Sequence, residues 1–246
     1  MRLSDKIAIV SGGGSGFGSG IVRKFAKEGA KVIVADIQLE NAKKVANAAG
    51  GIAVEVDVSN SLSFKNLVST TLEKFGKIDI MVNNAGITHT PKKMEDISEE
   101  EFDRIFSVNS KSVFLCAKYL VPLMTSNGGG NILNIASTAG ISPRPNLSWY
   151  NATKGWMISA TKAMAIELAP KKIRVNALAP VAGETPLLKS FMGGDTPEKR
   201  EKFLSTIPIG RFSTPDDMGN AACFLCSEEA SMITGVILEV DGGRCI

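Results

Sequence analysis

The sequence predicts an α/β fold with one doubly wound parallel sheet and helices on both faces. Short runs rich in Val and Ile alternate with longer helix-like segments from one end of the chain to the other. These runs lack alternating polar residues, which is typical of strands that are covered on both faces. Helix-like segments also end in glycine, as at Gly29 and Gly50. Right-handed crossovers between such strands produce a doubly wound sheet.

The elements follow one another without a linker, repeat or low-complexity tract, so we expect a single domain of the Rossmann-like type. The longest irregular stretch is 182–196, and we expect a substrate lid around 182–210, because long loops in compact domains often cover a site. Strands are predicted at residues 7–10, 31–35, 52–56, 78–82, 131–135, 174–177 and 236–240. Helices are predicted at 21–28, 39–49, 61–75, 98–124, 149–168 and 215–226.

Composition excludes several classes of protein. The chain has 246 residues, 44% of them hydrophobic and 22% charged, as in ordinary globular proteins. Its 28 basic and 25 acidic residues leave a net charge of +3, and the basic residues occur as scattered pairs. Nucleic acid needs a concentrated basic stripe and is not the expected partner. No apolar run approaches the roughly 20 residues of a membrane span, and no signal peptide is visible. We therefore expect a cytoplasmic protein.

The four cysteines do not predict disulfides or a metal site. Four in 246 residues is too sparse for a disulfide scaffold and fits a reducing compartment. Cys223 and Cys226 form a CxxC pair inside an apolar run, and His89 is the only histidine. Zinc would need two further ligands. We interpret the pair as small hydrophobic residues on one helix face and expect no metal.

A glycine-rich turn directly follows the first predicted strand, in the order Ser11-Gly12-Gly13-Gly14-Ser15-Gly16-Phe17-Gly18. Glycine lets backbone N–H groups approach a pyrophosphate at the start of the following helix. The GxxxGxG spacing departs from the common GxGxxG fingerprint. Its place between a buried strand and a helix nevertheless favours nucleotide binding.

Asp36 ends the second predicted strand, 18 residues after Gly18. A carboxylate there can accept hydrogen bonds from the adenosine ribose. It would also repel a 2′-phosphate by about 4 kcal/mol per charge pair at ~4 Å and an effective dielectric near 20. Neither Ser15 nor Ile37 supplies a compensating positive charge. We therefore expect NAD rather than NADP, with Asp36 as a solvated strand-end residue as the alternative.

Tyr150 and Lys154 are one turn apart on a predicted helix. A tyrosine with a pKa near 10 is a poor base, but a nearby ammonium and an oxidised nicotinamide would both lower its pKa. Ser137 follows a predicted strand, where doubly wound folds bind ligands, and its hydroxyl could bond a substrate oxygen. The alternatives are a surface pair for Tyr150 and Lys154 and a turn-capping role for Ser137.

Together these motifs resemble the short-chain dehydrogenase/reductase family over essentially the whole chain. The glycine-rich turn resembles the family's TGxxxGxG, with Ser11 keeping the hydroxyl of threonine. Ser137, Tyr150 and Lys154 resemble the catalytic serine and YxxxK. The other matching positions, in chain order, are Asp57-Val58, Asn83-Asn84-Ala85-Gly86, Val108-Asn109, Arg174-Val175-Asn176, Pro180 and Asp241-Gly242-Gly243.

The resemblance implies hydride transfer between NAD and a substrate carbon. It implies that Tyr150 is the acid/base, Ser137 orients the substrate, Lys154 holds the ribose and tunes Tyr150, and Asn109 completes a water-linked proton relay. It implies Thr185 as a contact of the nicotinamide carboxamide. The expected cofactor-binding residues are Gly12, Ser15, Gly16, Phe17, Gly18, Asp36, Ile37, Asp57, Val58, Asn83, Ala85, Gly86, Tyr150, Lys154, Pro180, Val181 and Thr185.

One position departs from the family pattern. The proline of the nicotinamide loop is usually followed by glycine, but here Val181 follows Pro180 and the glycine comes at Gly183. A β-branched residue resists positive φ and close backbone approach. The departure puts the loop's path in doubt, and we hypothesise that Val181 narrows the substrate side of the pocket.

The substrate pocket is expected to be mostly apolar, as small-molecule sites usually are. His89 and Arg144 are candidates to hold an anionic group, with exposed loop positions as the alternative. The expected walls are Thr138, Ala139, Trp149, Val181, Ala182 and the segment 187–192.

We expect an NAD-dependent oxidoreductase acting on a small secondary alcohol or ketone, or on a primary alcohol or aldehyde. One alternative is a 3-oxoacyl-[acyl-carrier-protein] reductase, which docks an acidic carrier and usually prefers NADP; residues 124–130 contain no Lys or Arg for that docking. A more remote alternative is an NAD-binding sensor without turnover. The resemblance also implies a homotetramer built as a dimer of dimers through the helices beginning at Ser98 and Trp149; the alternative is that the apolar faces of these helices only cover the sheet.

Overall fold

A computed structural model describes residues 1–246, and its centre is a seven-stranded sheet in which every paired strand is parallel. The strand order is β3-β2-β1-β4-β5-β6-β7, so the chain runs outward from β1 in one direction, returns, and continues in the other. This is the predicted doubly wound, Rossmann-like fold. The strands are β1 (Ile7–Ser11), β2 (Lys31–Asp36), β3 (Ile52–Glu55), β4 (Ile80–Asn83), β5 (Gly130–Ile135), β6 (Ile173–Pro180) and β7 (Ile237–Val240).

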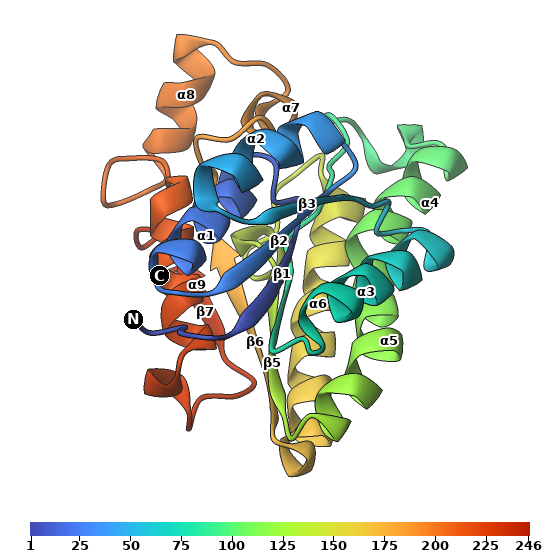
Figure 1. Cartoon of the computed structure of the whole chain (residues 1–246). Helices are drawn as coiled ribbons and strands as arrows, with labels where there is room; N and C mark the ends of the chain where they lie inside the picture. The colour runs from blue at the N-terminus through green and yellow to red at the C-terminus, as the bar shows by residue number, and fades with distance from the viewer.

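Helices cover both faces of the sheet (Figure 1). Helices α1, α2 and α9 pack on one face, while α3, α5 and α6 pack on the other. None of the helices combines the length and hydrophobicity that crossing a membrane requires. The helices are α1 (Gly16–Lys27), α2 (Leu39–Ala49), α3 (Ser61–Phe75), α4 (Glu99–Phe106), α5 (Ser112–Ser126), α6 (Ser148–Leu168), α7 (Leu188–Met192), α8 (Pro197–Leu204) and α9 (Pro215–Cys226).

The strands contribute alternate side chains to two separate cores. In β1, Ala8 and Val10 face the core under α1 and α9, whereas Ile9 faces the core under α3 and α5. In β2, Val34 faces the core under α1 and α9, and Ile33 faces the core under α3 and α5. Because side chains of a strand alternate between faces, a strand covered on both sides must be apolar at every position. This explains the uninterrupted Val/Ile runs of the sequence.

The predicted helix at 98–124 is interrupted. Helix α4 is followed by a π-helical turn, Ser107–Lys111, and then by α5. The periodicity of the sequence does not distinguish a π turn from an α turn, so the interruption was not predicted. The turn contains Asn109 and Ser110, both fully buried. Single π turns inside helices occur mostly at functional sites, and this one holds a predicted catalytic residue.

The segment 182–196, predicted to be irregular, contains a helix. Leu188–Met192 forms α7, and α8 follows directly after Thr196, whose hydroxyl accepts a hydrogen bond from the Lys199 N–H. Pro197 occupies the first turn of α8, a favoured position for proline. Thr196 followed by Pro197 is thus a helix-start signal that the sequence analysis missed. Helix α7 has only five residues, too few to show a helical period.

Cys223 and Cys226 lie on α9 and are buried in the core formed with α1. Burial raises the pKa of the Cys226 thiol to about 12. Protonated thiols in apolar surroundings pack as small hydrophobic groups, which agrees with a structural role for this pair.

Candidate active site

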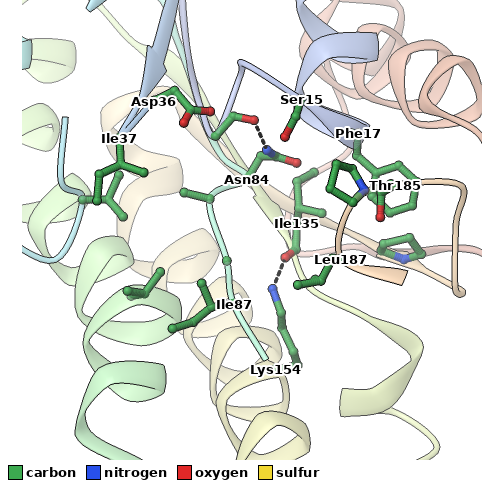
Figure 2. A pocket seen from close by; sticks show the side chains of 18 of the residues that line it. Ser15, Phe17, Asp36, Ile37, Asn84, Ile87, Ile135, Lys154, Thr185 and Leu187 are labelled. Atoms are coloured by element: carbon green, nitrogen blue, oxygen red, sulfur yellow. Dashed lines mark hydrogen bonds between the residues drawn. The ribbon is translucent and has the colours of Figure 1, made fainter. Parts of the chain in front are cut away.

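A cavity of about 410 Å³ opens at the carboxyl ends of β1, β2, β4 and β5, the edge where doubly wound sheets bind ligands (Figure 2). Fourteen of the predicted cofactor-binding residues line it: Gly12, Ser15, Gly16, Phe17, Asp36, Ile37, Asp57, Val58, Ala85, Gly86, Tyr150, Lys154, Pro180 and Thr185.

Two neighbouring loops are joined at the floor of this cavity. The Ser11 hydroxyl donates to the carbonyl of Val82 and accepts from the N–H groups of Asn84 and Ala85, at 3.0 and 3.1 Å. The Asn84 amide donates back to the carbonyls of Ser11 and Gly12. A hydroxyl is required at position 11 because it serves one acceptor and two donors at once. This explains how serine can stand where the family has threonine.

The start of helix α1 faces the cavity without a side-chain cap. Ser15 precedes the helix in an extended conformation and makes no capping hydrogen bond. The first N–H groups of a helix lack partners within the helix and carry its partial positive charge, so they suit a phosphate. Gly16 has φ of 50°, a conformation that favours glycine, and a Cβ there would lie 3.2 Å from Thr185. The residues present therefore fit a pyrophosphate.

The Asp36 carboxylate holds the glycine-rich turn in place. Its two oxygens accept hydrogen bonds from the Gly14 and Gln38 N–H groups, each at 2.9 Å. Both Asp36 and Ile37 line the cavity, and each carboxylate oxygen can accept more than one hydrogen bond. The arrangement fits a ribose with free hydroxyls and places a negative charge where a 2′-phosphate would have to lie.

Further along the cavity, Asp57 and Val58 follow β3 and line the wall. The Asp57 carboxylate accepts from both the N–H and the hydroxyl of Ser59, at 2.9 and 2.6 Å. This turn fixes the path of the chain beneath the expected adenine position. The orientation of Asp57 is thus set by its own loop.

Tyr150 lies in the first turn of α6, with only 6% of its surface exposed. Burial raises the pKa of Tyr150, and a hydrogen bond with Ser137 opposes part of that rise. Ser137 is also buried, and its hydroxyl accepts from the Ala139 N–H at 3.1 Å. The serine therefore caps a turn, which was the alternative weighed from the sequence, and also contacts the phenol; its hydrogen bond to a substrate oxygen stays a prediction.

Lys154 points from α6 toward the end of β5, where its Nζ donates to the Ile135 carbonyl at 2.7 Å (Figure 2). Nζ lies 5.9 Å from the centre of the Tyr150 ring. Burial lowers the pKa of Lys154 to about 8. The sequence analysis expected the ammonium to lower the pKa of Tyr150; in the structure burial dominates, and the Tyr150 pKa is raised. The expectation omitted the desolvation of the phenolate.

The π turn brings Asn109 against the loop that follows β4. Its carbonyl oxygen accepts from the Ile87 N–H, and its amide donates to the Ile87 carbonyl, both at 2.9 Å. The amide also donates to the hydroxyl of Thr153, one residue before Lys154. Asn109 thus ties this loop to α6 and positions Gly86 beside Lys154.

Three predicted cofactor contacts do not line the cavity. Gly18 lies inside α1, where its lack of a side chain lets the helix approach Gly12. The Asn83 amide donates to Asn134 and joins β4 to β5 behind the site. Val181 packs elsewhere, as described below. Lining residues that the sequence analysis did not select as cofactor contacts are Val56, Asn84, Ile87, Arg104, Val108, Ile135, Ala136, Pro186 and Leu187.

Val181 does not disturb the nicotinamide loop. Its backbone does not adopt positive φ, and its N–H donates to the Val240 carbonyl. Its side chain packs with Leu188, Met192 and Ile207 of the segment 182–210 and with Phe212, and Val181 does not line the cavity. The close approach occurs at Gly183, where a Cβ would lie 2.3 Å from the Phe17 ring. The glycine requirement is therefore met two residues later than the family pattern predicts.

The expected substrate walls are only partly correct. Ala139 packs with Tyr150 and Phe191, and Phe191, within the 187–192 segment, meets the Tyr150 ring edge-on at 5.6 Å. Trp149, in contrast, turns toward Phe102 of α4, and its indole N–H donates to the carbonyl of Met94, which precedes that helix. His89 is buried, with Nδ1 2.8 Å from the Thr90 carbonyl. Its Nε2 atom is buried without a hydrogen-bond partner, so the exposed position weighed as the alternative is wrong, and the role of His89 as an anion ligand stays a prediction.

The geometry defines a dinucleotide-binding α/β protein with a buried Ser-Tyr-Lys group beside its cavity, and comparison with known proteins narrows the class. The family model described as enoyl-(acyl carrier protein) reductase matches residues 12–244. 4-Formylbenzenesulfonate dehydrogenase of Comamonas testosteroni is 46% identical, with 100% of both chains covered.

Two solved structures with NADH superpose closely. The 3-ketoacyl-(acyl-carrier-protein) reductase of Brucella melitensis has a TM-score of 0.95 and 52% identity, covering 99% of this chain and 100% of that one. A 7α-hydroxysteroid dehydrogenase, bound to NADH and 7-oxo glycochenodeoxycholic acid, has a TM-score of 0.92 and 39% identity, covering 98% and 95%. The chain belongs to the short-chain dehydrogenase/reductase family, and these relatives are oxidoreductases.

Proposed function

We propose that the protein is an NAD-dependent oxidoreductase that interconverts a small alcohol and its carbonyl compound. The observation that carries this proposal is the meeting of Ser137, Tyr150 and Lys154 beside a cavity whose far end holds Asp36. Two relatives of known structure contain NADH. The uncapped start of α1 and the Asp36 carboxylate fit the same cofactor in this chain.

Bound NAD would supply the hydride acceptor or donor. Gly16, Phe17 and the first turn of α1 would hold its pyrophosphate, Asp36 its adenosine ribose, and Asp57 with Val58 its adenine. Pro180 and Thr185, on the loop after β6, are proposed contacts at the nicotinamide end. The proposed set of cofactor contacts is the fourteen lining residues given above.

Tyr150 would exchange the proton with the substrate oxygen. In the direction of carbonyl reduction its raised pKa is favourable, since the phenol is then fully protonated and ready to donate. In the direction of alcohol oxidation it must lose that proton, and a positive charge next to the ring is needed to stabilise the phenolate. Lys154 would provide part of this charge, and the oxidised nicotinamide, which is cationic, would add to it.

Ser137 would orient the substrate by hydrogen bonding to the same oxygen that Tyr150 protonates. Lys154 would hold the nicotinamide ribose through its ammonium, which is fixed at its present position by the Ile135 carbonyl. Asn109 would hold the loop at Ile87 and Gly86 in place and connect the buried end of the site to a proton relay.

The segment 182–210 would act as a lid within a single domain. Phe191 on α7 covers the Tyr150 ring, and the neighbouring α8 contributes Phe203, 5.9 Å from Phe191. A substrate that reaches Tyr150 must displace these rings or slide along them. The lid would thereby exclude water from the reacting atoms.

A 3-oxoacyl-[acyl-carrier-protein] reductase is the second candidate, favoured by the 52% identity to the Brucella reductase. Because that protein was solved with NADH, cofactor preference alone does not separate the two candidates. The segment 124–130 has no basic residue with which to dock an acidic carrier, which favours the small-molecule enzyme. The 46% identity to a dehydrogenase named for an aromatic aldehyde favours it as well.

We further propose a homo-oligomer. Aromatic side chains from α4 and α6 form a continuous strip of exposed Phe102, Phe106 and Trp156 and half-buried Trp149, in which neighbouring rings lie 5.4–6.2 Å apart. Exposed apolar strips of this kind mark protein–protein contacts. A tetramer of about four times 26.1 kDa is expected in light scattering; a monomer would contradict this part of the proposal.

The function is tested by steady-state assays with two cofactors and two substrate sets. NADH and NADPH are each supplied with a panel of small ketones and aldehydes, and separately with an acetoacetyl thioester. We expect reduction of the small carbonyl compounds, with kcat/KM for NADH at least ~10-fold above that for NADPH. Faster turnover of the thioester would favour the second candidate, and no turnover with any pair would refute the proposed activity.

A further inference from the structure

Arg144 places a positive charge close to the reacting group. It lies in the loop between β5 and α6, and the carbon of its guanidinium group is 4.3 Å from the centre of the Phe203 ring and 5.9 Å from that of Phe191. Phe191 in turn meets the ring of Tyr150. The Phe191 ring therefore lies between the guanidinium and the phenol, and a substrate that contacts both groups must span about the width of one aromatic ring.

This charge has no counter-ion in the protein. Arg200 and Arg211 both pair with carboxylates, but no carboxylate pairs with Arg144 or with Arg244. The Nη2 atom of Arg144 and the Nε atom of Arg244 are buried without a hydrogen-bond partner. Burial, together with the charge of Arg244, lowers the pKa of Arg144 to about 10, so Arg144 is charged at neutral pH.

Burial alone does not leave the N–H groups of an arginine side chain without hydrogen-bond partners. Arg174 is buried to a similar degree, yet it donates to the carbonyls of Leu225, Ile233 and Ser227 at 2.8–3.1 Å. Buried donors in folded proteins are nearly always satisfied. An unsatisfied guanidinium next to a catalytic tyrosine is thus a binding group whose partner comes from outside the chain.

We propose that Arg144 binds a carboxylate or sulfonate group of the substrate and that Arg244 adds a second positive charge. The substrate class is then a carbonyl or alcohol compound in which a flat apolar spacer separates the reacting carbon from one oxyanionic group. The spacer would lie against Phe191 and Phe203, and the oxyanion would take the free N–H groups of Arg144. This inference deepens the proposed function and rests on Tyr150 as the reacting group.

The geometry of both partners supports this assignment. A guanidinium presents parallel N–H groups that match the two oxygens of a carboxylate, and such charge-assisted pairs are the strongest hydrogen bonds in proteins. Stacking on Phe203 fixes the plane of the guanidinium before the substrate binds, which reduces the ordering cost of binding. The thioester of a carrier protein has no oxyanion at this distance from its carbonyl group.

The test compares 4-formylbenzoate with its neutral analogue 4-formylbenzamide, with 4-formylbenzenesulfonate as a third arm that separates carboxylate from sulfonate recognition. Turnover with NADH is measured for each compound. Isothermal titration calorimetry of benzoate and benzamide with the enzyme–NADH complex provides a readout that needs no turnover. We expect the wild type to prefer the charged compound at least tenfold in both measurements.

The variant Arg144→Gln should lower kcat/KM for the charged aldehydes about 10- to 100-fold and leave the neutral amide within threefold. Arg144→Lys should recover only part of the loss, because it keeps the positive charge but lacks the paired N–H groups of the guanidinium. Arg23→Gln, which removes a half-exposed arginine paired with Asp216 on α1 and α9, is the matched control and should leave the preference unchanged.

Equal binding of benzoate and benzamide by the wild type, or an equal loss for charged and neutral aldehydes in Arg144→Gln, would overturn the inference while leaving the proposed activity intact. If none of the aldehydes turns over and benzoate still binds at least tenfold more tightly than benzamide, the anion site stands and the proposed activity fails.

Discussion

On the cofactor side of the cavity, formed by the loops after β1 to β4, glycines stand at points of close backbone approach, as at Gly12 and Gly16. On the substrate side, residues 136–147 and 182–212 contribute Ala136, Thr185, Pro186 and Leu187 to the lining, and aromatic and aliphatic side chains pack behind them around Tyr150 and Val181. The cofactor side is held by hydrogen bonds such as those from Ser11, Asn84 and Asn109. The substrate side is held by packing, with Phe191 and Phe203 at its centre.

This difference shows how one fold can keep a fixed cofactor and change its substrate. Close backbone approach constrains which residues can stand at positions such as Gly12 and Gly18, because a Cβ there would lie within 3 Å of neighbouring atoms. A wall of side chains can be exchanged residue by residue while the backbone stays in place. Four predictions test whether the two sides really differ in this way.

The largest effect is expected for Gly18→Ala on the cofactor side. A Cβ at this position would lie 2.2 Å from the Gly12 carbonyl oxygen, so either the helix or the turn must move. NADH affinity should fall about 100-fold or more, measured by fluorescence titration. Gly155→Ala is the matched control, since a Cβ there meets its nearest atom only at 3.8 Å and should add about 0.5–1 kcal/mol of stability. Similar NADH affinities for the two variants would show that the wall is not defined by backbone contacts.

The second effect concerns Lys154, where the two sides meet. Lys154→Met should raise the free energy of unfolding by about 2 kcal/mol at pH 7: relief of the desolvation penalty, roughly 3 kcal/mol, less about 1 for the lost hydrogen bond. Burial lowers the pKa of this lysine from 10.5 to about 8, so the penalty is complete below the folded pKa and disappears as the pH rises toward the unfolded one. The gain, measured by urea unfolding, should therefore shrink between these values.

Lys162→Met, an exposed lysine on the same helix, is the control and should change stability little at any pH. A destabilised Lys154→Met, or a gain that does not depend on pH, would mean that the ammonium is not penalised by burial.

A third, smaller effect separates charge from geometry at Asp36. Asp36→Asn removes the charge and keeps an oxygen for the Gly14 N–H, while Asp36→Ala removes both. The ratio of kcat/KM values for NAD and NADP should fall about tenfold in Asp36→Asn because repulsion of the 2′-phosphate is lost. Asp36→Ala should in addition weaken the binding of NAD. An unchanged ratio in both variants would exclude Asp36 from cofactor selection.

The smallest effect is expected on the substrate side, for Phe191→Ala. Loss of the ring that covers Tyr150 should reduce kcat/KM for the carbonyl substrate about fivefold, mainly through KM, and should leave the NADH dissociation constant within twofold. KM for the carbonyl substrate and the dissociation constant for NADH are measured in parallel. A larger loss of NADH affinity than of substrate affinity would show that the two sides are not independent.

The same contrast explains what the sequence could predict. The strands, most helices and the glycine-rich turn were predictable because burial on two faces and close backbone approach restrict residue types locally. The π turn at Asn109, the helix at Leu188 and the stacking of Arg144 on Phe203 were not, because they depend on contacts between distant segments. The raised pKa of Tyr150 belongs to the same group, since only the folded chain defines how deeply the phenol is buried.

Trp149 shows most clearly what could not be predicted from the sequence. It precedes Tyr150 in the chain, so proximity in sequence predicted a wall of the substrate pocket. One residue of helix turns the side chain by about 100° and points it toward α4 instead. Position along a motif therefore predicts which element carries a residue, whereas the face of that element decides what it touches.

The central claim is that Tyr150 transfers the proton while a dinucleotide bound on the cofactor side carries the hydride. Single-turnover kinetics of Tyr150→Phe, with NADH binding measured on the same sample, test it most directly. We expect the rate of carbonyl reduction to fall by about 10³-fold or more, with NADH affinity within about threefold of the wild type. Reduction at a rate close to that of the wild type would contradict the account.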